Sequence, residues 1–269
     1  MKIIDAHTHI YPDKIALRAS LGVGDFYDLK PEYDGKVNTL INACEKAGVS
    51  QCLVHSVATN ALQVDSINSF IHKTINTYKG KFYGFATLHP HSSEKDIEGH
   101  IEKAISLGLH GFKLHPDFQK FYADGEKALK IYEIINGRLP ILIHAGDKRT
   151  DFSKPKRILN MCKAFPNQAF IAAHFGGWSE WGDCAKQLSD CGIYVDTSST
   201  QSFLPPKEIR ELIDAFSPSR VLFGTDYPIW NIKNEIEMLG SILYDNTEAE
   251  KIYYKNFEEL LQRHNIALI

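Results

Sequence analysis

Short apolar runs alternate with longer amphipathic segments along the whole chain. Each run is rich in Ile, Leu, Val or Phe and is followed by polar residues, glycine or proline, a pattern typical of β-strands. We expect a strand in each of eight such runs: Lys2–His7, Gln51–Val57, Phe82–Leu88, Gly111–His115, Pro140–His144, Ala169–His174, Ile193–Thr197 and Val221–Thr225.

Segments with helical periodicity lie between these runs. In the first, apolar residues recur at helical spacing and Gly48 follows, as is typical of a helix C-terminus. Ser92 is a candidate N-cap, and Thr247 and Glu250 have the spacing of a capping box. The expected helices are Val37–Ala47, Val64–Tyr78, Ser92–Leu107, Glu126–Ile135, Lys156–Ala164, Cys184–Ser189, Pro206–Phe216, Lys233–Leu243 and Thr247–Gln262.

This alternation predicts the fold class. Eight strand-then-helix units in one domain, residues 1–269, most simply form a parallel (β/α)8 TIM barrel of the α/β class. A doubly wound open sheet is the alternative, but it favours a Gly-rich phosphate-binding turn after the first strand. The chain has His7-Thr8-His9 at that place. The connection at Tyr11–Lys36 is too long for a minimal loop, and we expect it to cover the adjacent mouth of the barrel.

The composition is that of an ordinary globular protein. With 30 basic and 33 acidic residues the net charge is −3, which favours neither a nucleic-acid surface nor a polybasic membrane patch. No apolar run is long enough to span a bilayer, and no segment resembles a signal peptide. The five cysteines form no Cys-x-x-Cys pair, which is typical of free thiols in a reducing compartment. We therefore expect a cytoplasmic protein.

Chemically active side chains gather where the expected strands end. In a (β/α)8 barrel the C-terminal ends of all strands meet at one mouth, where catalytic groups lie. A random scatter of 12 histidines would not favour these positions so strongly. The candidates at the strand ends are His7, His9, Lys113, His115, His144, His174 and Asp226. His55 and His89 also end strands at this mouth, but we expect them to be structural rather than metal ligands.

This collection fits a catalytic divalent metal. His7 and His9 alternate on one strand and should share a face, with Asp5 below them. Imidazole and carboxylate ligands suit Zn²⁺, Mn²⁺ or Fe²⁺, of which we expect Zn²⁺ first. A carboxylate such as Asp226 could move a proton, and His174 could stabilise an oxyanion.

The motifs at these strand ends resemble a known family. The strings DAHTHIYP, GFKLHP, ILIHAG, AAHFGG and GTDYP follow one another in the order and spacing of the amidohydrolase superfamily. They are most similar to its amidohydrolase-related branch, which includes aminocarboxymuconate-semialdehyde decarboxylase-like proteins. The resemblance covers essentially the whole chain and implies a distorted (β/α)8 barrel.

The resemblance also implies roles for individual residues. His7, His9, His144 and Asp226 match metal ligands, and His174 matches a catalytic acid/base or electrostatic partner. In two-metal relatives such as dihydroorotases, the residues matching Lys113 and His174 bind the second ion, with the lysine carboxylated. One metal per chain and two metals both remain open, and the single-metal branch is slightly favoured.

Two metal-dependent activities fit these residues. The first is hydrolysis of an amide, lactone or ester bond in a small, carboxylated substrate by activated water. The second is a non-oxidative decarboxylation, in which the resemblance implies an arginine for the substrate carboxylate, and Arg18 is the nearby candidate. A barrel that binds without turnover, and a nuclease, rank lower. The sequence leaves a homodimer open and indicates neither a nucleic-acid nor a membrane partner.

Several residues have structural alternatives. Lys113 could bind a substrate carboxylate or pair with Asp5 or another acid in the barrel. His115 and Trp178 are candidates for substrate contact, but either could instead support a loop. A basic cluster after the fifth strand would recognise an anion if it folded over the mouth, and would otherwise be a solvated helix start: Lys148, Arg149, Lys154, Lys156 and Arg157.

Overall fold

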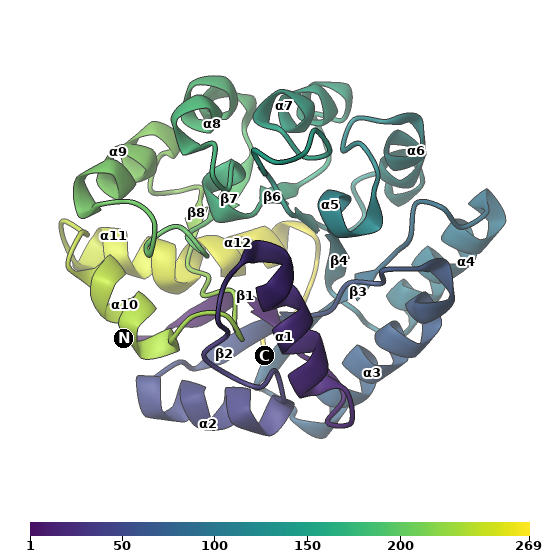
Figure 1. Ribbon diagram of the computed structural model, residues 1–269, viewed down its shortest axis with the longest axis horizontal. Helices are drawn as coiled ribbons and strands as arrows, with labels where there is room; N and C mark the ends of the chain where they lie inside the picture. The colour runs from purple at the N-terminus through teal and green to yellow at the C-terminus, as the bar shows by residue number, and fades with distance from the viewer.

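Eight parallel strands form one nearly closed barrel in the computed structural model, which describes all 269 residues (Figure 1). The strands follow one another in chain order around the sheet. The barrel closes where the Ala6 amide donates to the Phe223 carbonyl (2.8 Å) and the Asp226 amide to the His7 carbonyl (2.9 Å). The strands are β1 (Ile4–His9), β2 (Gln51–His55), β3 (Phe82–Thr87), β4 (Gly111–Leu114), β5 (Ile141–Ile143), β6 (Phe170–Ala172), β7 (Tyr194–Asp196) and β8 (Val221–Leu222).

Helices surround this barrel, as the alternating pattern predicts (Figure 1). The expectation of a single-domain (β/α)8 TIM barrel is therefore confirmed. The helices are α1 (Ala16–Tyr27), α2 (Val37–Ala47), α3 (Val64–Thr77), α4 (Glu94–Ser106), α5 (Pro116–Gln119), α6 (Glu126–Ile135), α7 (Pro155–Ala164), α8 (Trp181–Leu188), α9 (Pro206–Phe216), α10 (Ile232–Gly240), α11 (Asn246–Glu250) and α12 (Asn256–Arg263). The short helical turns are η1 (Ala61–Gln63), η2 (His174–Gly176), η3 (Ser189–Cys191) and the π-helical η4 (Lys251–Lys255).

Two apolar clusters hold the barrel together. The larger one lies between the strands and the surrounding helices and includes Val54, Phe112 and Ile143. The smaller one fills the barrel interior and includes Leu53 and Leu142, together with side chains of α12. Because α12 contributes to the inner cluster, it closes one end of the barrel, and the polar strand ends lie at the other.

A β-bulge in β1 determines which of its side chains face the mouth. Asp5 is in register with Cys52, a residue of the outer cluster, whereas His9 is in register with His55. The register shift lies between Asp5 and Thr8. Bulges commonly re-aim side chains next to active sites. The expectation that Asp5 lies below the two histidines on their face is therefore wrong: its carboxylate accepts hydrogen bonds from Thr225 and from the His7 amide.

The segment expected to be the longest loop contains a helix, α1. In Figure 1, α1 crosses the front of the barrel, and its residues Val23 and Tyr27 line the cavity at the mouth, so the expectation that this segment covers the mouth is confirmed. Two expected caps are shifted: Ser93 rather than Ser92 caps α4, and Asp245 rather than Thr247 caps α11. The expected C-terminal helix is divided into α11, η4 and α12.

No helix of the protein is both long enough and apolar enough to cross a bilayer.

Candidate metal centre

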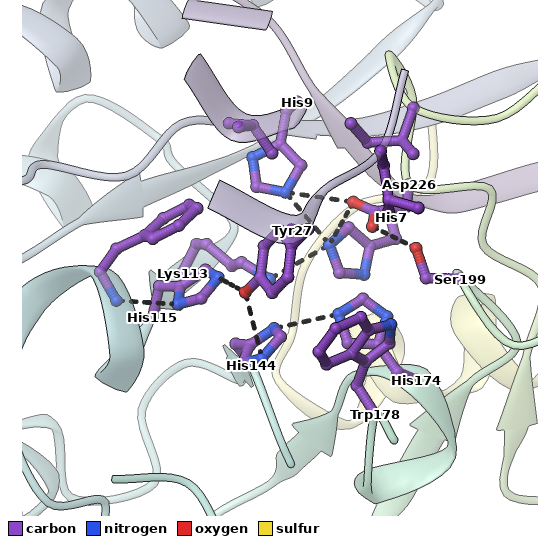
Figure 2. A pocket seen from close by; sticks show the side chains of 14 residues that line it. His7, His9, Tyr27, Lys113, His115, His144, His174, Trp178, Ser199 and Asp226 are labelled. Atoms are coloured by element: carbon purple, nitrogen blue, oxygen red, sulfur yellow. Dashed lines mark hydrogen bonds and ion pairs between the residues drawn. The ribbon is translucent and has the colours of Figure 1, made fainter. Parts of the chain in front are cut away.

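All the residues expected at the site line one small cavity at the mouth of the barrel (Figure 2). They come from the ends of five strands and from the loops that follow. The structure brings together His7, His9, Lys113, His115, His144, His174, Trp178 and Asp226.

The donor atoms of His7, His9 and Asp226 converge on one point. Nε2 of His7 lies 3.3 Å from Nε2 of His9. Oδ1 of Asp226 lies 3.5 Å and 3.4 Å from these two nitrogens. Ligand atoms about 2.0–2.1 Å from a tetrahedral Zn²⁺ would lie roughly 3.4 Å apart. The three residues therefore have the spacing and the chemistry of a divalent metal site.

Asp196, the last residue of β7, fixes the orientation of His7. Its Oδ2 lies 2.8 Å from Nδ1 of His7, and both side chains are buried. Burial, with Lys113 the next contributor, lowers the pKa of His7 well below its ordinary value, so the ring is neutral. A neutral ring that donates from Nδ1 to a carboxylate presents the lone pair of Nε2 to the centre, as metal-ligating histidines do.

A second pair of ring nitrogens meets on the other side of the cavity. Nδ1 of His144 lies 3.1 Å from Nε2 of His174. The opposite nitrogens lie 2.9 Å from the Gly146 carbonyl and 3.1 Å from the Ser198 carbonyl, both of which can only accept. His144 Nε2 and His174 Nδ1 therefore carry the protons, and His144 Nδ1 and His174 Nε2 face each other with lone pairs only. Two lone pairs repel at this distance, and a proton or a cation bound by these nitrogens would remove the repulsion.

Lys113 lies between the two sets of imidazoles. Its side chain is fully buried, and Nζ lies 3.2 Å from Nε2 of His7. Burial lowers its pKa to about 8, and the charges of Asp196 and Asp226 partly offset this effect. The alternative pairing with Asp5 is not found, because the Asp5 carboxylate is bonded to Thr225 and to the His7 amide.

Asp226 and His174 both have left-handed backbone conformations. Their φ angles are 59° and 60°, uncommon values for residues other than glycine, and such residues cluster at functional sites. Oδ2 of Asp226 accepts a hydrogen bond from Ser199, leaving Oδ1 free to face the histidines. Burial raises the pKa of Asp226 to about 6, opposed by the Ser199 bond and by Lys113.

Tyr27, at the end of α1, closes the cavity from above. Its hydroxyl lies 3.0 Å from Nε2 of His115 and 3.4 Å from Nε2 of His144. His115 stacks on His144, with ring centroids 4.0 Å apart. The ring of Trp178 meets the ring of Tyr27 edge to face at 4.8 Å. Figure 2 shows Tyr27 in front of the centre, between the two sets of imidazoles.

The cavity beneath Tyr27 is small, but a larger groove adjoins it. The cavity has a volume of about 20 Å³, which is enough for an ion or a water but not for an organic substrate. The groove runs between α1 and α3 and has a volume of about 580 Å³. His9, Val23 and Phe118 line both spaces, so a ligand in the groove would reach the centre along α1.

The basic cluster after β5 is largely engaged in ion pairs. Arg149 does reach the mouth, where its guanidinium packs over the rings of Phe26, Tyr27 and Trp178. The same guanidinium is paired with the Asp147 carboxylate. Lys154 and Arg157 pair with Glu180 and Asp124. These contacts favour a structural role that fixes the loops around the mouth.

The residues of the site that were not expected from the sequence include Tyr27, Asp196 and Ser199. Asp196 is the last residue of a strand, which is the same signal that identified the histidines. Ser199 follows three residues later. Tyr27 has no local signal, because its helix lies in a segment expected to be a loop.

The comparisons with known proteins agree with this architecture. The family model described as amidohydrolase matches residues 4–263. No curated protein sequence matches the chain. An uncharacterised TIM-barrel protein from Bordetella bronchiseptica is similar in structure, with a TM-score of 0.79 and 17% identity over 98% of this chain and 100% of its own.

Two further structures have stated activities. A dihydroxybenzoic acid decarboxylase from Polaromonas, with bound manganese and the inhibitor 2-nitroresorcinol, has a TM-score of 0.72 and 14% identity over 97% of each chain. A probable 2-pyrone-4,6-dicarboxylic acid hydrolase from Acinetobacter baumannii has a TM-score of 0.71 and 15% identity over 97% of this chain and 100% of its own. At these identities the similarity supports the fold alone. The family match over nearly the whole length shows that this chain belongs to the amidohydrolase family and is an enzyme of that superfamily.

Proposed function

We propose that the protein is a metal-dependent hydrolase that opens an amide, lactone or ester bond in a small, carboxylated molecule. The observation that carries this proposal is the convergence of His7 Nε2, His9 Nε2 and Asp226 Oδ1 within 3.3–3.5 Å of one another. His7, His9 and Asp226 would hold the ion, with His144 as a further ligand. Zn²⁺ is our first candidate, with Mn²⁺ or Fe²⁺ as alternatives.

The bound ion would acidify a water molecule and polarise the carbonyl group under attack. Asp226 is the group that takes the proton, because its Oδ1 faces the centre while Ser199 holds Oδ2. Asp226 then delivers this proton to the leaving group. Asp196 keeps His7 in one tautomer throughout.

Lys113 is a better candidate than His174 for stabilising negative charge on the substrate. His174 uses its Nδ1 proton on the Ser198 carbonyl, so its Nε2 could donate to an oxyanion only from the doubly protonated ring, and burial lowers the pKa of His174 to about 3. Burial lowers the pKa of Lys113 only to about 8, with Asp196 and Asp226 opposing the shift, so its ammonium is the better donor toward negative charge. If the site holds a second ion in addition to the first, Lys113 would not have this role. Lys113 in carboxylated form and His174 would then bind the second ion.

The substrate would bind in the groove between α1 and α3. The groove volume of about 580 Å³ is within the usual range of small-molecule sites. Its wall is largely apolar and contains Phe26, Phe70 and Phe118, with the cation Arg18 among them. A molecule with an apolar body and a carboxylate would match this lining.

A decarboxylase acting on a conjugated carboxylate is the second candidate. The observation in its favour is the aromatic enclosure of the centre, in which Tyr27, Phe118 and Trp178 line the cavity. A flat substrate would stack well against such rings. The same residues would hold the ion, and Lys113 or Asp226 would supply the proton to carbon.

The test is a measurement of metal content followed by a substrate screen. The full chain is purified without added metal, its metals are determined by elemental analysis, and intact mass reveals any carboxyl group on Lys113. The screen pairs lactones and cyclic amides with aromatic carboxylates. We expect at least one ion per chain and ring opening of a carboxylated substrate. Release of carbon dioxide without ring opening would favour the decarboxylase, and no metal after reconstitution would refute both.

A further inference from the structure

His55, the last residue of β2, is buried at the metal centre with no hydrogen bond. Its side chain is 0% exposed, and neither Nδ1 nor Nε2 has a partner. A neutral imidazole has one donor and one acceptor, and most buried polar atoms are paired. Leaving such a group unpaired carries a free-energy cost, because its lost hydrogen bonds to water are not replaced. This cost implies that something in the functional protein interacts with the ring.

The position of His55 indicates what that partner is. His55 is in register with His9 on the neighbouring strand. It lies two residues after Leu53, whose side chain belongs to the cluster inside the barrel, so the His55 side chain faces the same way. Its ring centroid lies 4.4 Å from that of His9 and 5.0 Å from that of His7. One nitrogen from each of the three rings lies within 4.8 Å of the other two. Donors of one tetrahedral Zn²⁺ lie roughly 3.4 Å apart, so the unrestrained His55 ring would turn toward His7 and His9 to complete the coordination.

We propose that His55 is a further ligand of the cation held by His7 and His9, so that strand β2 contributes to the metal site. The inference rests on the metal centre of the proposed function but not on its reaction. It also has a consequence for the choice of metal. Imidazole ligands suit Zn²⁺ and Fe²⁺, whereas carboxylate-rich sites suit Mn²⁺. A site that contains His7 and His9 already binds Zn²⁺ more tightly than Mn²⁺, and an added imidazole from His55 increases this preference.

The chain offers a matched control in His89. This histidine also follows a strand, is 6% exposed, and has an unpartnered Nε2. It lies outside the His7, His9 and His55 group, and its Nδ1 accepts a hydrogen bond from the His91 amide. Replacing His89 therefore measures the effect of losing a buried strand-end imidazole away from the ion.

The experiment compares metal binding by His55→Phe, His55→Gln and His89→Phe with the wild type, using the full chain. Each protein is stripped of metal, checked by thermal unfolding, and titrated with Zn²⁺ alone and Mn²⁺ alone against a chromophoric chelator. We expect both His55 variants to bind Zn²⁺ at least about 10-fold more weakly, with a smaller loss for Mn²⁺. His89→Phe should match the wild type. Zn²⁺ affinity within twofold of the wild type in a folded His55 variant would overturn the inference.

A measurement on the unaltered protein covers the case in which both variants fail to fold. In crystals of the wild type soaked with Zn²⁺, anomalous scattering locates the ion. A His55 nitrogen roughly 2.0–2.3 Å from it supports the inference, and one beyond about 3 Å overturns it. The variant His7→Ala separates the two proposals. If it binds Zn²⁺ like the wild type, the proposed metal centre itself fails, whereas undiminished binding by the His55 variants alone refutes only the role of His55.

Discussion

Asp196 holds His7 by a contact of 2.8 Å between Oδ2 and Nδ1, in a part of the barrel that solvent does not reach. The other oxygen of Asp196 accepts hydrogen bonds from the backbone amides of His174 and Ser198. One carboxylate at the end of β7 therefore orients a histidine from β1 and fixes the backbone of a histidine after β6. This connects the two sets of imidazoles in the centre.

Replacing Asp196 by asparagine should weaken metal binding without removing a ligand. The amide is a poorer acceptor for His7 Nδ1 and cannot satisfy all the donors that Asp196 now satisfies. Loss of such a supporting partner typically costs about 10–100-fold in metal affinity. Chelator competition measures this value. Asp190→Asn, at an exposed carboxylate before β7, is the control. Unchanged affinity in Asp196→Asn would show that His7 does not need this carboxylate.

Replacing Asp226 by asparagine should remove the group that moves the proton. Asparagine keeps the size of the side chain and can still accept from Ser199. Turnover should fall by roughly 10²–10⁴-fold, the usual contribution of a general acid or base. Steady-state kinetics at saturating metal check this, because they separate proton transfer from weaker metal binding. Near-normal turnover would exclude Asp226 as the proton carrier.

The residues of the centre could be predicted because parallel strands bring their C-terminal ends to one mouth. His7, Lys113, His144 and Asp226 are far apart in the chain, yet each follows an apolar run, and this fact is local and visible in the sequence. The barrel itself could be predicted for the same reason, since each strand-then-helix unit shows its own periodicity.

The parts that escaped prediction depend on tertiary contacts. The bulge in β1 turns Asp5 away from the histidines, and no residue in β1 indicates it. Tyr27 meets His115 and His144 only because α1 folds back over the mouth. The pairing of Asp196 with His7 joins residues 189 positions apart. Strand periodicity places residues on faces but does not say which polar groups will meet.

Tyr27→Ala should open the mouth and speed the loss of metal. The hydroxyl of Tyr27 contacts His115 and His144, and its ring packs against Trp178. Losing one such hydrogen bond destabilises the closed mouth by about 1 kcal/mol. The mouth should therefore open, and release the metal, roughly 5- to 10-fold faster. The rate of metal transfer to excess EDTA measures this. Leu21→Ala, at a side chain on α1 that is 49% exposed, is the control. Equal rates in both variants would mean that Tyr27 does not close the centre.

Glu235 should make the folded protein less stable as the pH rises. Its side chain is buried, and Oε2 accepts a hydrogen bond from Gln201 at 2.7 Å. Burial raises its pKa to about 8, whereas an unfolded glutamate has a pKa of about 4.3. Between these values the folded chain keeps a proton that the unfolded chain loses, so the free energy of unfolding falls through this window and levels off above it.

Glu235→Gln removes this titration while keeping an acceptor for Gln201. The unfolding temperatures of variant and wild type should therefore differ little near pH 4.5, and the variant should become progressively more stable up to about pH 8. Each kcal/mol corresponds to roughly 2–4 °C in a chain of this size. Scanning calorimetry from pH 4.5 to 9 measures the difference, and all other titrating groups cancel between the two proteins. A difference that stays constant across this range would show that Glu235 is already ionised in the folded state at pH 4.5, and that its burial is compensated by more than the single bond to Gln201.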